Sequence, residues 1–188
     1  EENDILLIFD EIQTGVGLTG RFWAYQHLDI VPDIISFGKK MQVCGILASD
    51  KLNEVDGVFK VSSRINSTWG GNLVDMVRST RYLQVIAEEN LVENAAAVGR
   101  YLLDRLHHLQ DHHAGVVSNS RGLGLMAAFD LPDTDTRNRA LKKIKESGVL
   151  MVGCGPRSIR FRPPLNLTRD EVDEGVEIID RSLGEVIG

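Results

Sequence analysis

Two short apolar runs each end in a group that can take part in catalysis. Residues 5–9 lead directly into Asp10, and residues 34–37 lead through a glycine into Lys39. Ligands of open α/β sheets bind beyond the carboxyl ends of the strands, so we expect both groups at one sheet edge. A lysine can form a Schiff base with the aldehyde of pyridoxal phosphate, and an acid can pair with the protonated ring nitrogen. Asp10 and Lys39 together therefore predict a pyridoxal phosphate site.

A glycine-rich loop after the first run offers an alternative. Residues 15–20 read GxGxxG, the pattern of dinucleotide-binding loops. The loop does not directly follow a strand, however, and Ile35 stands where an acid is expected about 20 residues later. A loop whose glycines adopt positive φ angles explains the pattern better. A nicotinamide-dependent oxidoreductase domain stays as the alternative function.

The composition limits the classes of partner. The chain has 188 residues, a formal net charge of −6 and a pI near 5.4, which argues against binding to nucleic acid or to an anionic membrane surface. No apolar run approaches the roughly 20 residues of a membrane span. Cys44 and Cys154 are too few for a disulfide framework, so we expect small buried thiols in a reducing cytoplasm.

The hydrophobic pattern predicts an α/β core over residues 1–90 and a small α+β unit over residues 91–188. A continuous apolar run is typical of a strand buried on both faces, and helical stripes repeat every three to four residues. In the core we expect a buried parallel strand at 5–9, further strands at 34–37, 46–48 and 58–61, and a helix within 71–90. In the second unit we expect helices at 91–112, 137–146 and 168–183, and strands at 116–117, 124–129, 149–152 and 158–161.

Four histidines lie near the end of the second of these helices. His108 and His112 have the i,i+4 spacing that could bind a transition metal, and His107 and His113 flank them. No catalytic partner is near in the sequence, so a solvated helix end is the favoured interpretation. We therefore expect no metal site. Further along, Thr168 and Glu171 fit a capping box at the start of the last helix.

Four motifs, in order and over the whole chain, resemble the class III (ornithine/GABA-type) pyridoxal phosphate-dependent aminotransferases. They read FDEIQTG followed by GR, PDIISFGK, NSTWGGN, and IRFRPPL. The KMQVCG stretch over residues 40–45 is similar to the L-lysine 6-aminotransferase subgroup. The resemblance implies that residues 1–90 are the C-terminal part of a cofactor-binding large domain of the type I fold, with a mainly parallel sheet. Residues 91–188 would then be the small α+β C-terminal domain.

The resemblance also implies roles for single residues around the cofactor. Asp10 would keep the pyridine nitrogen protonated, and Gln13 would hydrogen-bond the phenolic oxygen and lie beside the substrate. Lys39 would hold the cofactor as a Schiff base and then act as the base and acid that move protons. Thr68 would reach the cofactor phosphate of a neighbouring subunit, which implies a homodimer with shared active sites.

Two arginines are candidates for binding substrate. Arg160 would clamp a carboxylate bidentately, the geometry that guanidinium provides best, and Arg162 is the adjacent alternative. In an alternating strand the two point the same way, so the sequence does not separate them. The implied reaction passes the terminal amino group of L-lysine, or of a similar ω-amino acid, to 2-oxoglutarate, giving a semialdehyde and glutamate.

The resemblance covers only the C-terminal part of the family's subunits. The phosphate loop, the aromatic ring that stacks on the cofactor and a second substrate-binding arginine belong to the family's upstream part and have no counterpart here. We therefore expect a fragment that carries half of an active site and is inactive by itself. A truncated, non-catalytic aminotransferase-like module is the second alternative.

Overall fold

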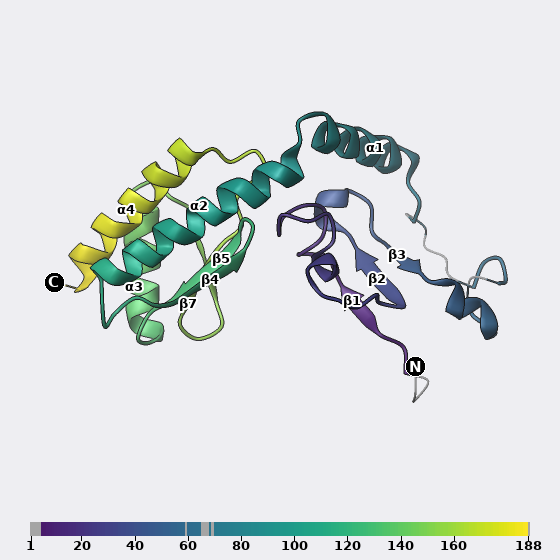
Figure 1. Ribbon diagram of the computed structural model, residues 1–188, viewed down its shortest axis with the longest axis horizontal. Helices are drawn as coiled ribbons and strands as arrows, with labels where there is room; N and C mark the ends of the chain where they lie inside the picture. The colour runs from purple at the N-terminus through teal and green to yellow at the C-terminus, as the bar shows by residue number, and fades with distance from the viewer. Residues whose placement is uncertain (1–4, 59, 65–67, 69, 188) are drawn as a thin grey trace. The chain divides into compact units, whose positions relative to one another are not determined.

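The computed structural model describes residues 5–58, 60–64, 68 and 70–187 (Figure 1). The chain divides into two compact units, which are described separately here. The first comprises Glu1–Gly17 with Arg21–Asn90, and the second comprises Leu18–Gly20 with Leu91–Gly188. Within the described residues, no helix is both long and apolar enough to cross a membrane.

The first unit is built on a three-stranded sheet in the order β1-β2-β3. β1 (Ile8–Asp10) runs parallel to β2 (Ile34–Phe37), whereas β3 (Gly45–Ala48) runs antiparallel to β2. The predicted neighbouring strands are therefore confirmed, and the sheet mixes both directions. The unit's helices are η1 (Ala24–His27), η2 (Lys39–Met41), η3 (Asp50–Glu54) and α1 (Leu73–Glu88).

The prediction of a buried first strand over residues 5–9 is wrong. β1 begins only at Ile8, and Ile5 and Ile8 are 73% and 60% exposed. A continuous apolar run indicates a strand covered on both faces, and the described part of this unit does not cover these side chains. The apolar stripe of α1 is likewise exposed at Leu73 and Val77, and only Ser79 and Ile86 of that helix are buried.

Two further expectations for this unit need correction. Residues 58, 60 and 61 form no strand, because the Lys60 N–H donates to the Gly57 carbonyl at 3.2 Å and closes a turn. Cys44 is an exposed free thiol rather than a buried one, since it lies in an irregular segment directly before β3. Cys154 of the second unit is also exposed, at the end of a short edge strand.

The second unit packs three helices against an antiparallel sheet. The strand order is β4-β5-β7-β6. The elements are α2 (Leu91–His112), β4 (Ser118–Leu123), β5 (Met126–Asp130), α3 (Thr134–Glu146), β6 (Val152–Cys154), β7 (Ser158–Phe161) and α4 (Arg169–Ile187).

The core of the second unit lies between this sheet and its helices. Alternate residues of the strands point to opposite faces, so Phe129 and Ile159 are buried on the face of the sheet that α2 and α3 contact, and α4 packs on both of these helices. Leu106 and Ile179, from α2 and α4, complete this apolar layer. The opposite face carries the polar residues of the same strands, among them Arg160, and this alternation positions the predicted substrate arginines.

Helix ends explain where the predicted boundaries shift. The Val116 and Val117 N–H groups both donate to the His113 carbonyl at 3.0 Å, so these two valines close the end of α2 and β4 starts later. β6 likewise begins only at Val152. α3 starts earlier than predicted because the Asp133 carboxylate accepts the Thr136 N–H at 2.7 Å and caps the helix.

The predicted capping box of the last helix is confirmed. The Thr168 N–H donates to the Glu171 carboxylate at 2.8 Å, and the Glu171 N–H donates to the Thr168 hydroxyl at 3.3 Å. These bonds hold the pKa of Glu171 below its usual value. The box fixes the start of α4, the helix that carries Asp180.

Candidate active site

The register of the first two strands brings the predicted catalytic groups to one edge. Asp10 is aligned with Ser36, and Lys39 follows three residues later at the carboxyl end of β2. Asp10 Oδ1 accepts hydrogen bonds from Ser36 Oγ at 3.1 Å and from the Ile12 N–H at 3.0 Å. The acid is therefore tied to the very strand whose end delivers the lysine.

The two adjacent lysines differ in backbone and in partner. Lys39 is exposed and has φ of 48°, in the left-handed region that costs a non-glycine residue about 1–3 kcal/mol. Its carbonyl accepts the Gln42 N–H at 2.9 Å and Gln42 Nε2 at 3.1 Å, and these bonds hold the turn. Lys40 Nζ donates instead to the Gln13 carbonyl at 2.9 Å. Lys40 thus positions a loop, and Lys39 is the better candidate for chemistry.

The other two predicted cofactor ligands occupy loops. Gln13 lies half-buried after β1 and is anchored through its carbonyl by Lys40. Thr68 lies in an exposed turn, and Asn66, Ser67 and Trp69 of the same motif are outside the described residues. The role of Thr68 concerns a second subunit and stays a prediction.

Glu11 is a buried acid whose role the sequence did not reveal. Its carboxylate accepts the Tyr25 N–H at 2.8 Å and the Ala24 N–H at 3.1 Å, so it caps the start of η1. It also accepts the Thr14 hydroxyl. These bonds fold the segment between β1 and η1 onto itself and so position Gln13. The residue before η1 is Trp23, whose side chain does not cap the helix. The lack of a local cap is the sequence signal that an acid from elsewhere could cap η1.

The glycine-rich loop does not have the geometry of a dinucleotide site. The dinucleotide pattern must connect a strand to the N-terminus of a helix, whereas residues 15–20 form turns that lead to the single turn of η1. Gly17 and Gly20 have φ of 89° and 84°, which confirms the predicted need for positive φ angles. A Cβ on Gly15 would lie 2.6 Å from the Trp23 ring. The nicotinamide alternative therefore has no support from this loop.

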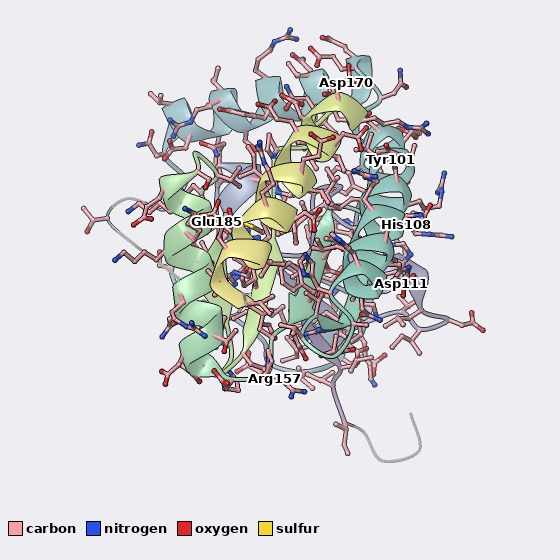
Figure 2. All side chains as sticks on the ribbon, turned by 90° about the vertical axis from the view of Figure 1, so that its left-hand side faces the viewer. Tyr101, His108, Asp111, Arg157, Asp170 and Glu185 are labelled. Atoms are coloured by element: carbon pink, nitrogen blue, oxygen red, sulfur yellow. The ribbon has the colours of Figure 1, made fainter. Side chains whose placement is uncertain are left out.

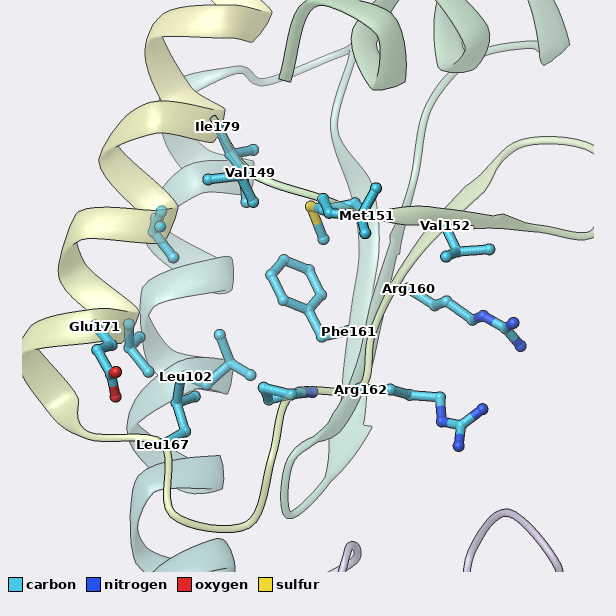
Figure 3. A pocket seen from close by; sticks show the side chains of 15 residues that line it. Leu102, Val149, Met151, Val152, Arg160, Phe161, Arg162, Leu167, Glu171 and Ile179 are labelled. Carbon is cyan, nitrogen blue, oxygen red and sulfur yellow. The ribbon is translucent and has the colours of Figure 1, made fainter. Parts of the chain in front are cut away.

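In the second unit, Arg160 and Arg162 point to the same side of β7. Figure 3 shows both side chains directed away from Phe161, which points into an apolar hollow of about 360 Å³ on the other side. Both arginines contribute to the lining of this hollow, and together with Arg121 they also line a second hollow of about 230 Å³. The structure therefore keeps both candidates on one face, as alternation predicts.

Arg121 is held by a buried carboxylate. Asp130 Oδ1 accepts hydrogen bonds from Ser158 Oγ at 2.6 Å and from Arg121 at 2.9 Å, and Oδ2 accepts from Asn119 at 3.0 Å. Burial alone would raise the pKa of Asp130, but these hydrogen bonds and the Arg121 charge outweigh it and lower the pKa to about 2. No sequence pattern predicted this network, because its members come from three different strands and a bulge.

The comparison with known proteins decides the family. The family model described as Aminotransferase class-III matches residues 1–183. This chain belongs to the class III aminotransferases. It is 50% identical over 183 residues to an L-lysine-epsilon aminotransferase of Amycolatopsis lactamdurans, and this match covers 96% of this chain and 41% of that protein. It is 34% identical over 188 residues to a 4-aminobutyrate aminotransferase of Dictyostelium discoideum, covering 99% of this chain and 37% of that protein.

A solved structure agrees with this assignment. The lysine aminotransferase of M. tuberculosis matches with a TM-score of 0.96 and 49% identity, over 98% of this chain and 43% of that one. The chain thus spans less than half the length of the relatives it matches. The structural neighbours share its mixture of helices and sheets and are pyridoxal phosphate-dependent aminotransferases.

Proposed function

We propose that this chain supplies the catalytic lysine and the ring-nitrogen acid of a lysine aminotransferase. The whole enzyme would pass the terminal amino group of L-lysine, or of a similar ω-amino acid, to 2-oxoglutarate and release a semialdehyde and glutamate. The observation that carries this proposal is the parallel pairing of β1 and β2, which puts Asp10 and Lys39 at the same sheet edge.

The donor set at this edge fits pyridoxal phosphate. When bound, that group supplies an electron sink for bond breaking at the carbon that bears the amino group. Asp10 would keep a proton on the ring nitrogen, held in place by Ser36 and the Ile12 N–H. Lys39 would bind the aldehyde carbon and move protons with the same amine. Gln13, anchored by Lys40, would orient the ring oxygen and the substrate.

The substrate carboxylate would bind at the arginine face of the second unit. Arg160 is the residue proposed for this task and Arg162 the adjacent alternative, because both line the hollow beside the Arg121–Asp130 pair. Both proposed substrates, lysine and 2-oxoglutarate, carry a carboxylate that a guanidinium can bind bidentately. Lysine is the preferred donor because the identity to the lysine-named relative is 50%, against 34% to the 4-aminobutyrate-named one.

The assembly is part of the same proposal. Residues 1–90 would belong to the cofactor-binding large domain and residues 91–188 would be the small C-terminal domain, in a homodimer whose sites are shared through Thr68. In support, the exposed side of α1 presents an apolar hollow of about 520 Å³ lined by Leu73, Val77 and Tyr82. A surface of this kind is typical of a subunit contact. The free thiols suit a reducing cytoplasm.

A pair of lysine variants tests the proposed function. In a full-length protein that contains this chain, Lys39→Ala should abolish both transamination and the visible absorbance of the bound cofactor after desalting. Lys40→Ala is the matched control and should keep the absorbance, because the Lys40 amine donates to the Gln13 carbonyl and is not the group proposed to bind the aldehyde. Turnover that survives in Lys39→Ala would refute the assignment. A preference for ornithine or 4-aminobutyrate over lysine would overturn only the choice of donor.

A further inference from the structure

A cluster of nitrogen and oxygen ligands lies in the second unit, where the end of α2 meets α4. Nδ1 of His112 lies 2.8 Å from Asp180 Oδ1, and Nε2 of His113 lies 2.6 Å from the same oxygen. One such atom from each of the three residues lies within 4.8 Å of the other two. The imidazole rings are 4.7 Å apart, so both are directed at one point on α4.

The surrounding backbone holds this arrangement in place. The His113 N–H donates to the Leu109 carbonyl at 3.0 Å, which extends the pattern of α2 by one residue. The His113 carbonyl in turn accepts two N–H groups from the loop that follows. α2 and α4 pack against each other through buried side chains such as Leu109 and Val176. The ligand atoms are therefore brought together by the fold itself.

We propose that His112, His113 and Asp180 bind a divalent transition-metal ion, with zinc as the best-fitting ion. Two imidazoles and one carboxylate are ligands that zinc accepts, at about 2.0–2.2 Å from the metal. Adjacent ligand atoms of a tetrahedral site at such distances are about 3.4 Å apart. The present separations of 2.6 Å and 2.8 Å are shorter by less than about 1 Å, so small side-chain rotations would admit the ion.

A hollow beside the cluster offers further donors. It has a volume of about 180 Å³ and is lined by His108 and Glu177, each one helical turn before a proposed ligand. Figure 2 shows His108 on α2, the helix beside α4. Arg105 also lines the hollow, but its charge is paired with Asp173 at 2.9 Å. Either His108, Glu177 or a water molecule can therefore occupy a fourth position.

The state of the carboxylate suits a cation. Partial burial would raise the pKa of Asp180, but hydrogen bonds from His112 and His113 outweigh this and keep the pKa below its ordinary value. This site belongs to the second unit and shares no residue with the proposed catalytic edge.

Metal binding to the 188-residue chain tests the proposal directly. The protein is prepared without a histidine tag, with Cys44→Ser and Cys154→Ser so that the exposed thiols cannot compete, and it is stripped with a chelator. Titration calorimetry with zinc chloride should give one ion per chain. Loss of an outer-shell partner typically lowers metal affinity by roughly 10- to 100-fold. Replacing a direct ligand should lower the zinc affinity by at least as much. His112→Ala should show this loss, since its side chain is 68% exposed and the change spares the core.

His107→Ala is the matched control, because His107 is an exposed histidine of the same helix that does not line the hollow. It should bind zinc like the unchanged protein. Asp180→Asn keeps the shape of the side chain and should lose zinc affinity to a similar extent as His112→Ala. If circular dichroism shows that His112→Ala disturbs the helix, the Asp180→Asn result tests the site instead. Absence of saturable binding, unchanged affinity in Asp180→Asn, or an equal loss in His107→Ala would each overturn the proposal.

Discussion

Lys39 is unusual in its backbone as well as in its side chain. Its φ of 48° falls where glycine is the favoured residue, and the two bonds from Gln42 keep it there. We predict that Lys39→Gly is more stable than Lys39→Ala by about 1 kcal/mol, because only glycine adopts this conformation without strain. Urea denaturation of the 188-residue chain measures the difference.

The same pair of changes at Lys40 is the control. Lys40 does not have a positive φ angle, so there alanine should be the more stable replacement. Equal stability of Lys39→Gly and Lys39→Ala would show that the left-handed turn is not maintained in solution. The strain at Lys39 would then have no part in presenting its amine.

Asp130 gives the second unit a defined dependence on pH. Its pKa of about 2 lies below the ordinary 3.8, so its contribution to the free energy of unfolding is complete above about pH 4 and is lost as the pH falls toward 2. A difference of nearly two pH units corresponds to about 2 kcal/mol. Asp130→Asn should remove this contribution.

Circular dichroism is the suitable measurement, because α2, α3 and α4 give the second unit most of its signal. Urea denaturation at pH 5 and at pH 2.5 should show a smaller loss of stability in Asp130→Asn than in the unchanged chain. Other carboxylates titrate in both proteins and cancel in the comparison. An identical loss in both would contradict the role given to the Asp130 network.

Some site residues could be read from the sequence and others could not. Asp10 and Lys39 are visible because each ends an apolar run, and strand ends are where α/β sheets bind ligands. Glu11 and Asp130 act through contacts with segments 9 to 28 positions away in the sequence. For the histidines the sequence pattern favours a solvated helix end, since Asp180 reaches them only when α2 and α4 pack together.

At the scale of whole elements, the close packing of α2 depends on Gly99. A Cβ at this position would lie 2.1 Å from the Gly124 backbone, in the turn between β4 and β5. Alanine normally favours a helix over glycine by about 1 kcal/mol, but a clash with backbone cannot be relieved by moving a side chain. We predict that Gly99→Ala lowers the free energy of unfolding by about 1–3 kcal/mol.

Gly175 of α4 is the matched position, because an added Cβ there meets nothing within 4 Å. Gly175→Ala should therefore stabilise the chain by about 1 kcal/mol. Thermal melts of both variants, followed by circular dichroism, measure the two signs. A stabilising Gly99→Ala would mean that α2 lies farther from the β4–β5 turn than the structure places it.

Helices were easier to predict than strands, for a physical reason. A helix satisfies its own hydrogen bonds, and a capping residue such as Thr168 marks its start in the sequence. A strand extends only as far as its neighbour does, so residues 5–7 and 116–117 stay outside the sheets despite their apolar side chains. The parallel pairing of β1 with β2 was predictable because both runs are apolar and adjacent in the chain.

At the scale of the whole molecule, the exposed apolar side chains and the partial coverage of the relatives both indicate surfaces that further protein covers in those relatives. Ile5, Leu73 and Val77 are more than 70% exposed, and the chain spans 41% of the Amycolatopsis protein. Exposed apolar side chains of this size are typical of surfaces that another segment or subunit covers. We therefore expect the 188 residues alone to bind pyridoxal phosphate weakly and to self-associate.

Complementation is the most direct test of the central claim that this chain carries the catalytic half of a lysine aminotransferase. The chain is mixed with the N-terminal part of the Amycolatopsis relative, and glutamate formation from lysine and 2-oxoglutarate is measured. Neither piece should be active alone, the mixture should be active, and a mixture with Lys39→Ala should not be. Enzyme-like rates from the isolated 188 residues, or activity that survives Lys39→Ala, would contradict the account.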